Sequence, residues 1–224
     1  MNARRMALGV VLVVTAGVLV PAARGHGADH VSLAAAGERW WRTSPDPANP
    51  VACATCHHEP AETRGWAASF PKFKAQPPPH ARVMTLLQAN AEAVRRHYRL
   101  ADPRPVATAI TAYLTTLGAG MPLSPGVVAG QPVFPTRLRA LGESVARGRQ
   151  LYARRCATCH AAPAIASAVA AFPRGREGRA ESLEEFLDRH ALPRGLLPWD
   201  SPSMADVIGY LVAARAGRFL KEEQ

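Results

Sequence analysis

The feature that most constrains this chain is a five-residue motif, Cys-Ala-Thr-Cys-His, which occurs at residues 53–57 and again at 156–160. In each copy the two thiols can add to the two vinyl groups of one haem, and the histidine can bind the iron from its proximal side. The chain has 4 cysteines, and all of them lie in these motifs. The sequence therefore predicts two covalently attached c-type haems, each with its iron.

Other uses of a Cys-x-x-Cys pair fit these motifs less well. A four-cysteine zinc site has no use for a histidine directly after both pairs, and a thioredoxin-like disulfide belongs to a single motif within a βαβ pattern. We therefore assign the thioether bonds and the proximal iron ligands as follows. They are Cys53, Cys56 and His57 for the first haem, and Cys156, Cys159 and His160 for the second.

The N-terminus has the pattern of a secretory signal peptide over residues 1–25. Arg4 and Arg5 precede an apolar run over residues 6–20, and small residues follow Pro21. The alternative is an uncleaved membrane anchor. Because c-type haem is attached outside the bacterial cytoplasm, we expect a periplasmic protein with no membrane span after cleavage.

The formal net charge of +10 favours anionic partners. A basic surface is typical of proteins that bind nucleic acid, an anionic membrane or an acidic protein. Nothing besides the charge suggests nucleic acid. For an exported haem protein we expect redox protein partners with an acidic docking face.

The two halves of the chain match one another at equivalent places, which predicts a tandem duplication. A glycine lies four residues before an aromatic residue ahead of each haem motif, so that each pair shares one face of a helix. A Phe-Pro pair follows each motif, and an apolar segment from Tyr to Gly closes each half. The matched residues are Gly37 and Trp41 with Gly148 and Tyr152, Phe70-Pro71 with Phe172-Pro173, and 113–120 with 210–217.

Residues 122–137 are rich in Pro and Gly and are predicted to be a linker. The predicted haem domains are residues 26–121 and 138–224. With 20 prolines and no alternation of apolar and polar residues, the sequence predicts an all-α fold with long loops and two tandem cytochrome c-like domains.

Each half resembles a class I cytochrome c over residues 37–217. The resemblance rests on the haem motif, on the Gly/aromatic helix before it, and on a closing helix that can begin at Pro105 or Pro202. It implies that the N-terminal helix crosses the C-terminal helix over the haem.

The first half also resembles the SHP-type haem proteins and the haem subunit of the thiosulfate-oxidising Sox enzymes. The shared pattern includes Trp41, Arg95-Arg96 and Gly120-Met121. In the former family the distal ligand is an Asn after two arginines, and in the latter it is a Cys on the equivalent helix. This chain has His97 there and no spare cysteine for a cysteine-bound sulfur.

The sixth ligand of the first haem has several candidates, which are His97, Asn90, His80, Met84 and Met121. Asn90 and His97 fall on one face of a predicted helix, which could present either to the iron. Met121 comes after the closing helix, later than a class I ligand should. We predict His97, with Asn90 as the alternative.

For the second haem, Ser182 and Glu185 form a capping box that starts a short helix, and His190 stands at its end. Met204 is the alternative, but it lies inside the predicted closing helix. We predict His190.

The motifs and their surroundings are compatible with two functions. The first is an exported dihaem cytochrome c that transfers electrons between redox partners through His/His or His/Met ligated haems. The alternative is a haem protein that binds or converts a small molecule, a gas or a sulfur species, at one incompletely ligated haem. Since no acid-base constellation accompanies either motif, electron transfer is favoured over a stand-alone enzyme. The chain could also be a subunit of a larger redox complex.

The duplicated motif makes a direct prediction about cofactor stoichiometry. Mass spectrometry of the mature protein should show the mass of residues 26–224 plus two haems. One haem, or zinc in place of haem, would contradict the assignment of both motifs.

Overall fold

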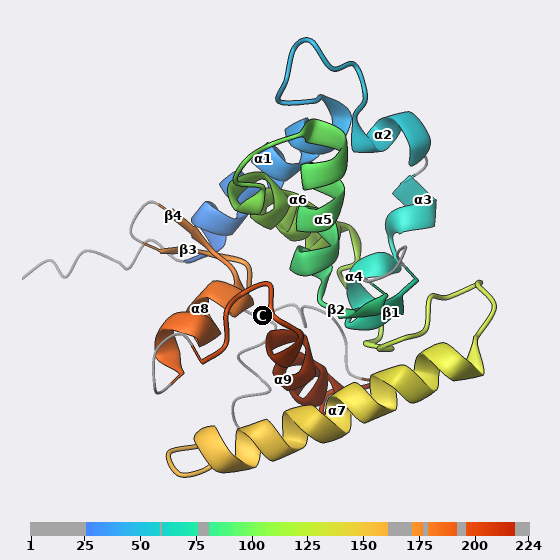
Figure 1. Cartoon of the computed structure of the whole chain (residues 1–224). Coiled ribbons are helices and arrows are strands. Elements are labelled where there is room, and N and C mark those ends of the chain that lie inside the picture. The colour runs from blue at the N-terminus through green and yellow to red at the C-terminus, as the bar shows by residue number, and fades with distance from the viewer. Residues whose placement is uncertain are drawn as a thin grey trace, which may run out of the picture.

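The computed structural model describes residues 26–58, 60–75, 81–160, 172–176, 179–191 and 196–217. The predicted signal peptide lies outside these residues. The described chain is mainly helical, with two short hairpins between the helices (Figure 1). The helical prediction is confirmed, and the two hairpins are additions that the sequence pattern did not predict.

The elements of the first half run from α1 to α6. They are α1 (His26–Arg42), α2 (Cys53–Cys56), α3 (Pro60–Thr63), α4 (Trp66–Ser69), β1 (Lys72–Lys74), β2 (Arg82–Met84), α5 (Leu86–Tyr98) and α6 (Arg104–Leu117). The second half contains α7 (Pro135–Arg155), β3 (Arg174–Arg176), β4 (Arg179–Glu181), α8 (Leu183–His190) and α9 (Pro202–Ala213).

Both hairpins are antiparallel pairs of three-residue strands. β1 pairs with β2 so that Lys72 faces Met84, and β3 pairs with β4 so that Arg174 faces Glu181. Strands this short hold too few residues to show alternation, which is why the sequence pattern did not predict them. Each hairpin follows a Phe-Pro pair whose peptide bond is cis.

Two close helix crossings organise the molecule. In the first half α1 packs on α6, where a Cβ at Gly37 would overlap the carbonyl oxygen of Ala109. In the second half α7 packs on α9, where a Cβ at Gly148 would overlap the carbonyl oxygen of Asp206. Only glycine lets the two backbones approach this closely. The crossing predicted for each half is therefore present.

Local sequence signals set the ends of the later helices. Ser201 caps α9 by accepting a hydrogen bond from the Met204 N–H at 3.1 Å, and Pro202 occupies the first turn. Ser182 caps α8 in the predicted capping box, with the Glu185 carboxylate accepting from the Ser182 N–H at 2.9 Å.

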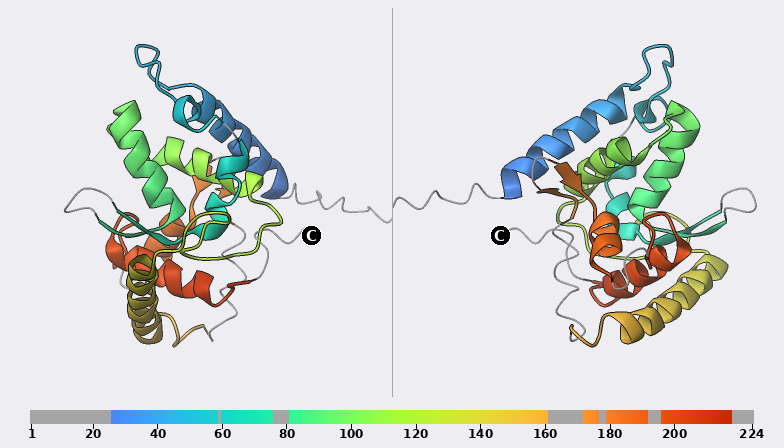
Figure 2. Two further views of the ribbon diagram at one scale, coloured as in Figure 1. Left: turned by 90° about the vertical axis from the view of Figure 1, so that its right-hand side faces the viewer. Right: turned by 60° about the vertical axis from the view of Figure 1, so that its left-hand side comes forward.

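Each half has its own hydrophobic core around its crossing. The first gathers Trp41, Phe70 and apolar residues of α5 and α6. The second gathers Tyr152, Phe172 and apolar residues of α8 and α9. Figure 2 shows the two groups of helices on different sides of the molecule, with α1, α5 and α6 in one and α7, α8 and α9 in the other.

The hairpins cross from each half to the other. The β1–β2 hairpin lies against α7 and α9, while β3 and β4 lie against α1 and α6. A small cluster of apolar residues fills the first of these contacts. Its buried members are Val83, Leu141 and Ala205, with Phe73 and Val145 packed beside them. The two halves therefore bury surface against each other, unlike two independent domains that are joined only by a linker.

A buried polar contact also joins the halves. Thr85, the N-cap residue of α5, donates its hydroxyl to the Glu184 carboxylate in the first turn of α8 at 2.5 Å. Glu184 lines an internal space between Phe70 and Phe172. Burial raises the pKa of Glu184 to about 7, although the Thr85 bond acts in the opposite direction.

The segment predicted as a linker, 122–137, is held by both halves. The Ser124 and Gly126 N–H groups donate to backbone carbonyls of α4 at 2.9 Å each, and the Leu123 side chain is buried in the second core. Its last residues belong to α7, which begins at Pro135. The domain boundaries themselves stay a prediction.

Gly148 and Gly142 provide a matched test of the crossing, because both lie on α7. Gly148→Ala should destabilise the protein by several kcal/mol, since its Cβ has no room against Asp206. Gly142→Ala should be neutral or stabilising by up to about 1 kcal/mol, since nothing lies within 4 Å of its Cβ. Urea unfolding followed by circular dichroism measures both. Equal stabilities would show that the crossing is not close.

Glu184→Gln should remove part of the pH dependence of stability. An acid whose pKa is raised in the folded state favours folding below its unfolded pKa, near 4.5, and loses this contribution as the pH rises through about 7. The unaltered protein should therefore lose about 3 kcal/mol of unfolding free energy over this range from this group. The amide variant should not. Glu143→Gln, at an exposed position of α7, is the control. If the free energy of unfolding changes with pH in the same way for the unaltered protein and for Glu184→Gln, Glu184 does not titrate in this range.

Candidate haem sites

The first motif folds into the single turn α2. The Thr55 hydroxyl accepts from the Ala52 N–H at 3.0 Å, and the His57 N–H donates to the Cys53 carbonyl at 3.0 Å. This turn places both thiols and the imidazole around one opening. The structure describes all four cysteines and none of them forms a disulfide; Cys53 is half-buried and Cys56 is exposed.

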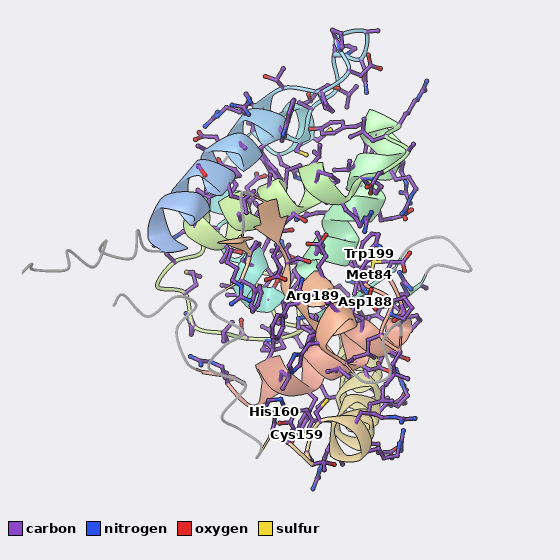
Figure 3. All side chains as sticks on the ribbon, turned by 90° about the vertical axis from the view of Figure 1, so that its left-hand side faces the viewer. Met84, Cys159, His160, Asp188, Arg189 and Trp199 are labelled. Carbon is purple, nitrogen blue, oxygen red and sulfur yellow. The ribbon has the colours of Figure 1, made fainter. Side chains whose placement is uncertain are left out.

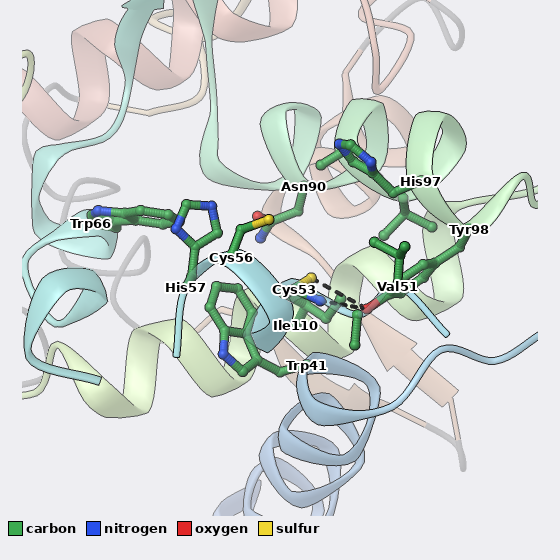
Figure 4. A pocket seen from close by; sticks show the side chains of 13 residues that line it. Trp41, Val51, Cys53, Cys56, His57, Trp66, Asn90, His97, Tyr98 and Ile110 are labelled. Atoms are coloured by element: carbon green, nitrogen blue, oxygen red, sulfur yellow. Dashed lines mark hydrogen bonds between the residues drawn. The ribbon is translucent and has the colours of Figure 1, made fainter. Parts of the chain in front are cut away.

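A largely apolar cavity opens beside the first motif (Figure 4). It holds about 660 Å³ of space between the atoms, part of it open to solvent. Its lining brings together Cys53, Cys56 and His57 of the motif with Asn90 and His97 of α5. The helix predicted to carry the distal candidates thus borders the same cavity as the first motif, and its role at a haem stays a prediction.

Two tryptophans hold the His57 ring. Trp66 meets it edge to face with ring centres 4.9 Å apart, and Trp41 lies 6.1 Å away on another side. Burial lowers the pKa of His57, with Lys74 and His97 adding to the effect and Glu62 opposing it. A neutral imidazole is the form that binds a metal.

Tyr98 is a site residue that the sequence did not point to. Its hydroxyl donates to the Trp40 carbonyl at 2.6 Å, accepts from the Cys53 N–H at 3.1 Å, and lies 3.3 Å from the Cys53 sulfur. Burial raises the pKa of both the Tyr98 hydroxyl and the Cys53 thiol. Tyr98 therefore fixes α5 to the haem motif, and its place next to His97 was the one available signal.

The distal candidates of the first site differ in their surroundings. Asn90 is buried and donates to the Thr111 hydroxyl at 2.9 Å. His97 is exposed in the last turn of α5, where its carbonyl accepts from Asn49 at 2.6 Å. Met84 and Met121 do not line the cavity. His80 lies outside the described residues.

The second motif follows the end of α7. The Cys156 N–H donates to the Tyr152 carbonyl at 2.8 Å, and the His160 N–H donates to the Cys156 carbonyl at 3.0 Å. The buried Tyr152 side chain donates its hydroxyl to the His160 carbonyl at 3.0 Å. Burial raises the pKa of the Cys156 thiol. Figure 3 shows Cys159 and His160 together, far from Met84 and Trp199.

His190 and His160 face each other across the second site. Their Nε2 atoms lie 3.4 Å apart, and their ring centres lie 5.7 Å apart. The His190 ring stacks on Phe186 at 5.1 Å with an interplanar angle of 12°, which fixes its orientation. Met204 is fully buried in the second core, within α9.

Comparisons with known proteins agree with this geometry. Residues 36–123 match the family model for the cytochrome c domain of SoxA/TsdA. The crystal structure of SoxXA from P. pantotrophus is similar, with a TM-score of 0.64 and 14% sequence identity over 86% of this chain and 76% of that one. A search of curated proteins found no match.

The family-model match shows that residues 36–123 resemble the cytochrome c domain of SoxA/TsdA. The structural match shows a helical, cytochrome c-like fold. A cytochrome c domain implies haem c with iron and a function in electron transfer. Among the described helices, none combines the length and the apolar character needed to cross a membrane.

Proposed function

We propose that this chain is an exported dihaem cytochrome c, with one haem in each half, that transfers single electrons between protein partners. Bound haem supplies a one-electron couple between ferric and ferrous iron. Eight residues would hold the two groups. They are Cys53, Cys56, His57 and His97 for the first haem, and Cys156, Cys159, His160 and His190 for the second.

The observation that carries this proposal is the opposed pair of imidazoles at the second motif. A metal held between two imidazoles needs roughly 4 Å between their nitrogens, because each metal–nitrogen bond is about 2.0 Å. The separation of 3.4 Å between the His160 and His190 nitrogens is close to this requirement. At this separation one neutral imidazole can also donate a hydrogen bond to the other, so the contact fits a shared metal without requiring one.

The first site supports the same assignment through its cavity. His57 and His97 both line it, and the thiols of Cys53 and Cys56 lie at its edge. The apolar lining would exclude water from the group, and the aromatic contacts of Trp41 and Trp66 would keep the His57 ring in place.

Matched features of the two halves support the proposal of two haem domains. Gly37 and Gly148 make the same crossing, and a capped helix, α5 or α8, carries the distal candidate in each half. Both capping boxes are complete, at Thr85 and at Ser182. The same fold element would then serve each haem.

The formal charge falls from +10 to +7 when Arg4, Arg5 and Arg24 leave with the signal peptide, and this remaining positive charge supports an acidic docking face on the redox partners. The similarity to the SoxXA structure supports a place within a larger redox complex. Export to the periplasm rests on the N-terminal sequence pattern and on the chemistry of haem c attachment.

One observation favours the alternative function at the first haem only. Both His97 and His190 are exposed, but among the described residues only His190 stacks on an aromatic ring, that of Phe186. A distal histidine held this loosely can leave the iron, and the cavity would then admit a small molecule. Carbon monoxide binding to the unaltered, reduced protein would support this alternative.

His190→Ala should open the second haem. Loss of the distal imidazole should turn this iron high-spin in the oxidised protein and let one equivalent of carbon monoxide bind after reduction. Electron paramagnetic resonance and carbon monoxide titration measure the two effects. His58→Ala, an exposed histidine beside the proximal ligand of the first haem, should change neither. If His190→Ala leaves the spin state and carbon monoxide binding unchanged while Met204→Ala alters both, the second haem has His/Met ligation instead.

The first haem is tested by His97→Ala and Asn90→Ala in parallel. We expect His97→Ala to produce the high-spin, carbon monoxide-binding state and Asn90→Ala to leave the spectrum unchanged, because Asn90 is engaged by Thr111. Covalent haem attachment should persist in both variants, since the thiols and His57 are untouched. The opposite pattern would assign Asn90 as the ligand.

A further inference from the structure

A second hollow lies between the β1–β2 hairpin, the 122–137 segment and the start of α7, and it shares no lining residue with the cavity beside the first motif. It holds about 870 Å³ of space between the atoms, part of it open to solvent. Three cationic residues from two separate elements line it, which are Lys72 and Lys74 of β1 and Arg137 of α7. Gln131 also lines it and adds a neutral amide.

The three cations have no acidic partner in the part of the chain that the structure describes. Among the described residues, no carboxylate lies within ion-pair distance of any of the three. Lys72 donates to the Ser69 hydroxyl at 3.0 Å and lies 4.5 Å from the centre of the Phe70 ring, and Arg137 lies 4.2 Å from the Phe134 ring. The aromatic faces hold the cations in place without neutralising them.

Burial and, to a smaller extent, the neighbouring positive charges disfavour the charged forms of the two lysines. Burial, followed by the charge of Lys74, lowers the pKa of Lys72 to about 8. Burial, followed by the charge of Arg137, lowers the pKa of Lys74. Partly buried like charges without counter-charges destabilise a fold, unless something outside the chain supplies the missing negative charge.

The second half provides an internal comparison at the equivalent hairpin. Arg174 occupies the position of Lys72, since each follows a Phe-Pro pair and lies 4.5 Å from the preceding phenylalanine ring. Arg174 faces Glu181 across the hairpin and pairs with it at 3.0 Å. Lys72 faces Met84 instead. One hairpin thus carries its own counter-charge, and the other does not.

We propose that Lys72, Lys74 and Arg137 form a binding site for a small, doubly charged oxyanion, of the size of sulfate or phosphate. The cations surround a hollow instead of spreading over a flat face, which suits a compact anion better than the surface of a protein. A guanidinium and two ammonium groups supply the charge-assisted hydrogen bonds that such an anion accepts.

The position of this site connects it to the first haem motif. Lys72 lies 6.0 Å from the Trp66 ring, which itself meets the His57 ring at 4.9 Å. An anion bound at Lys72 would therefore place negative charge two side chains away from the proximal ligand. This connection rests on the proposed function, whereas anion binding itself does not.

The test is a titration of the haem-loaded protein with sodium sulfate at constant ionic strength, maintained with sodium chloride. Isothermal titration calorimetry should show saturable binding of one sulfate. Lys74→Gln and Arg137→Gln should each weaken it about tenfold or more, as expected for the loss of one charge-assisted hydrogen bond. Arg139→Gln removes the same charge from an exposed position of α7 outside the hollow and should bind as the unaltered protein does.

Absence of saturable binding would overturn the proposal, and so would equal weakening in the Arg139→Gln control, which would indicate unspecific attraction to a basic surface. Loss of affinity for an acidic protein partner in Lys74→Gln, without any sulfate binding, would assign the cluster to protein docking instead. Because calorimetry does not depend on the haem ligands, these outcomes are independent of the distal ligand assignments. A sulfate-dependent fall in the midpoint potential of the first haem would confirm the connection through Trp66.

Discussion

The absence of a side chain at two helix crossings determines where the rest of this chain lies. At Gly37 and Gly148 the backbones of α1 and α7 come so close to α6 and α9 that no Cβ fits between them. This close approach fixes the separation of the two helices in each pair. The aromatic residue one turn after the glycine then faces the haem motif. Trp41 contacts His57, and Tyr152 binds the carbonyl of His160. The close approach of the two helices thus determines where the histidine of each haem motif lies.

Features set by neighbouring residues could be predicted from the sequence. The caps at Ser182 and Ser201, the crossing glycines and both haem motifs depend on short spacings, and the structure contains each of them. Features set by distant residues could not. The cluster of Val83 with residues of α7 and α9 joins segments far apart in the chain, and no local pattern marks it.

The candidate sites show the same division. His190 was predicted from its place at the end of a capped helix, and its imidazole does face His160. Tyr98 was missed because its role depends on contacts with Cys53 and Trp40, which are 45 and 58 residues away. The basic hollow was missed as well, since Arg137 reaches Lys74 only through the fold. The net charge of the sequence counts these cations but does not show where they lie. Only the structure shows that they line one hollow.

The exchange of hairpins between the halves has a consequence for the order in which the chain matures. Synthesis delivers the first half before α7 and α9 exist, so Phe73 and Val83 have no covering partner at that stage. The nascent first half therefore exposes an apolar patch that only the later helices can cover. Completion of the C-terminal helices acts as the closing step for both halves, and a chain cut short after α6 would be a target for aggregation and proteolysis.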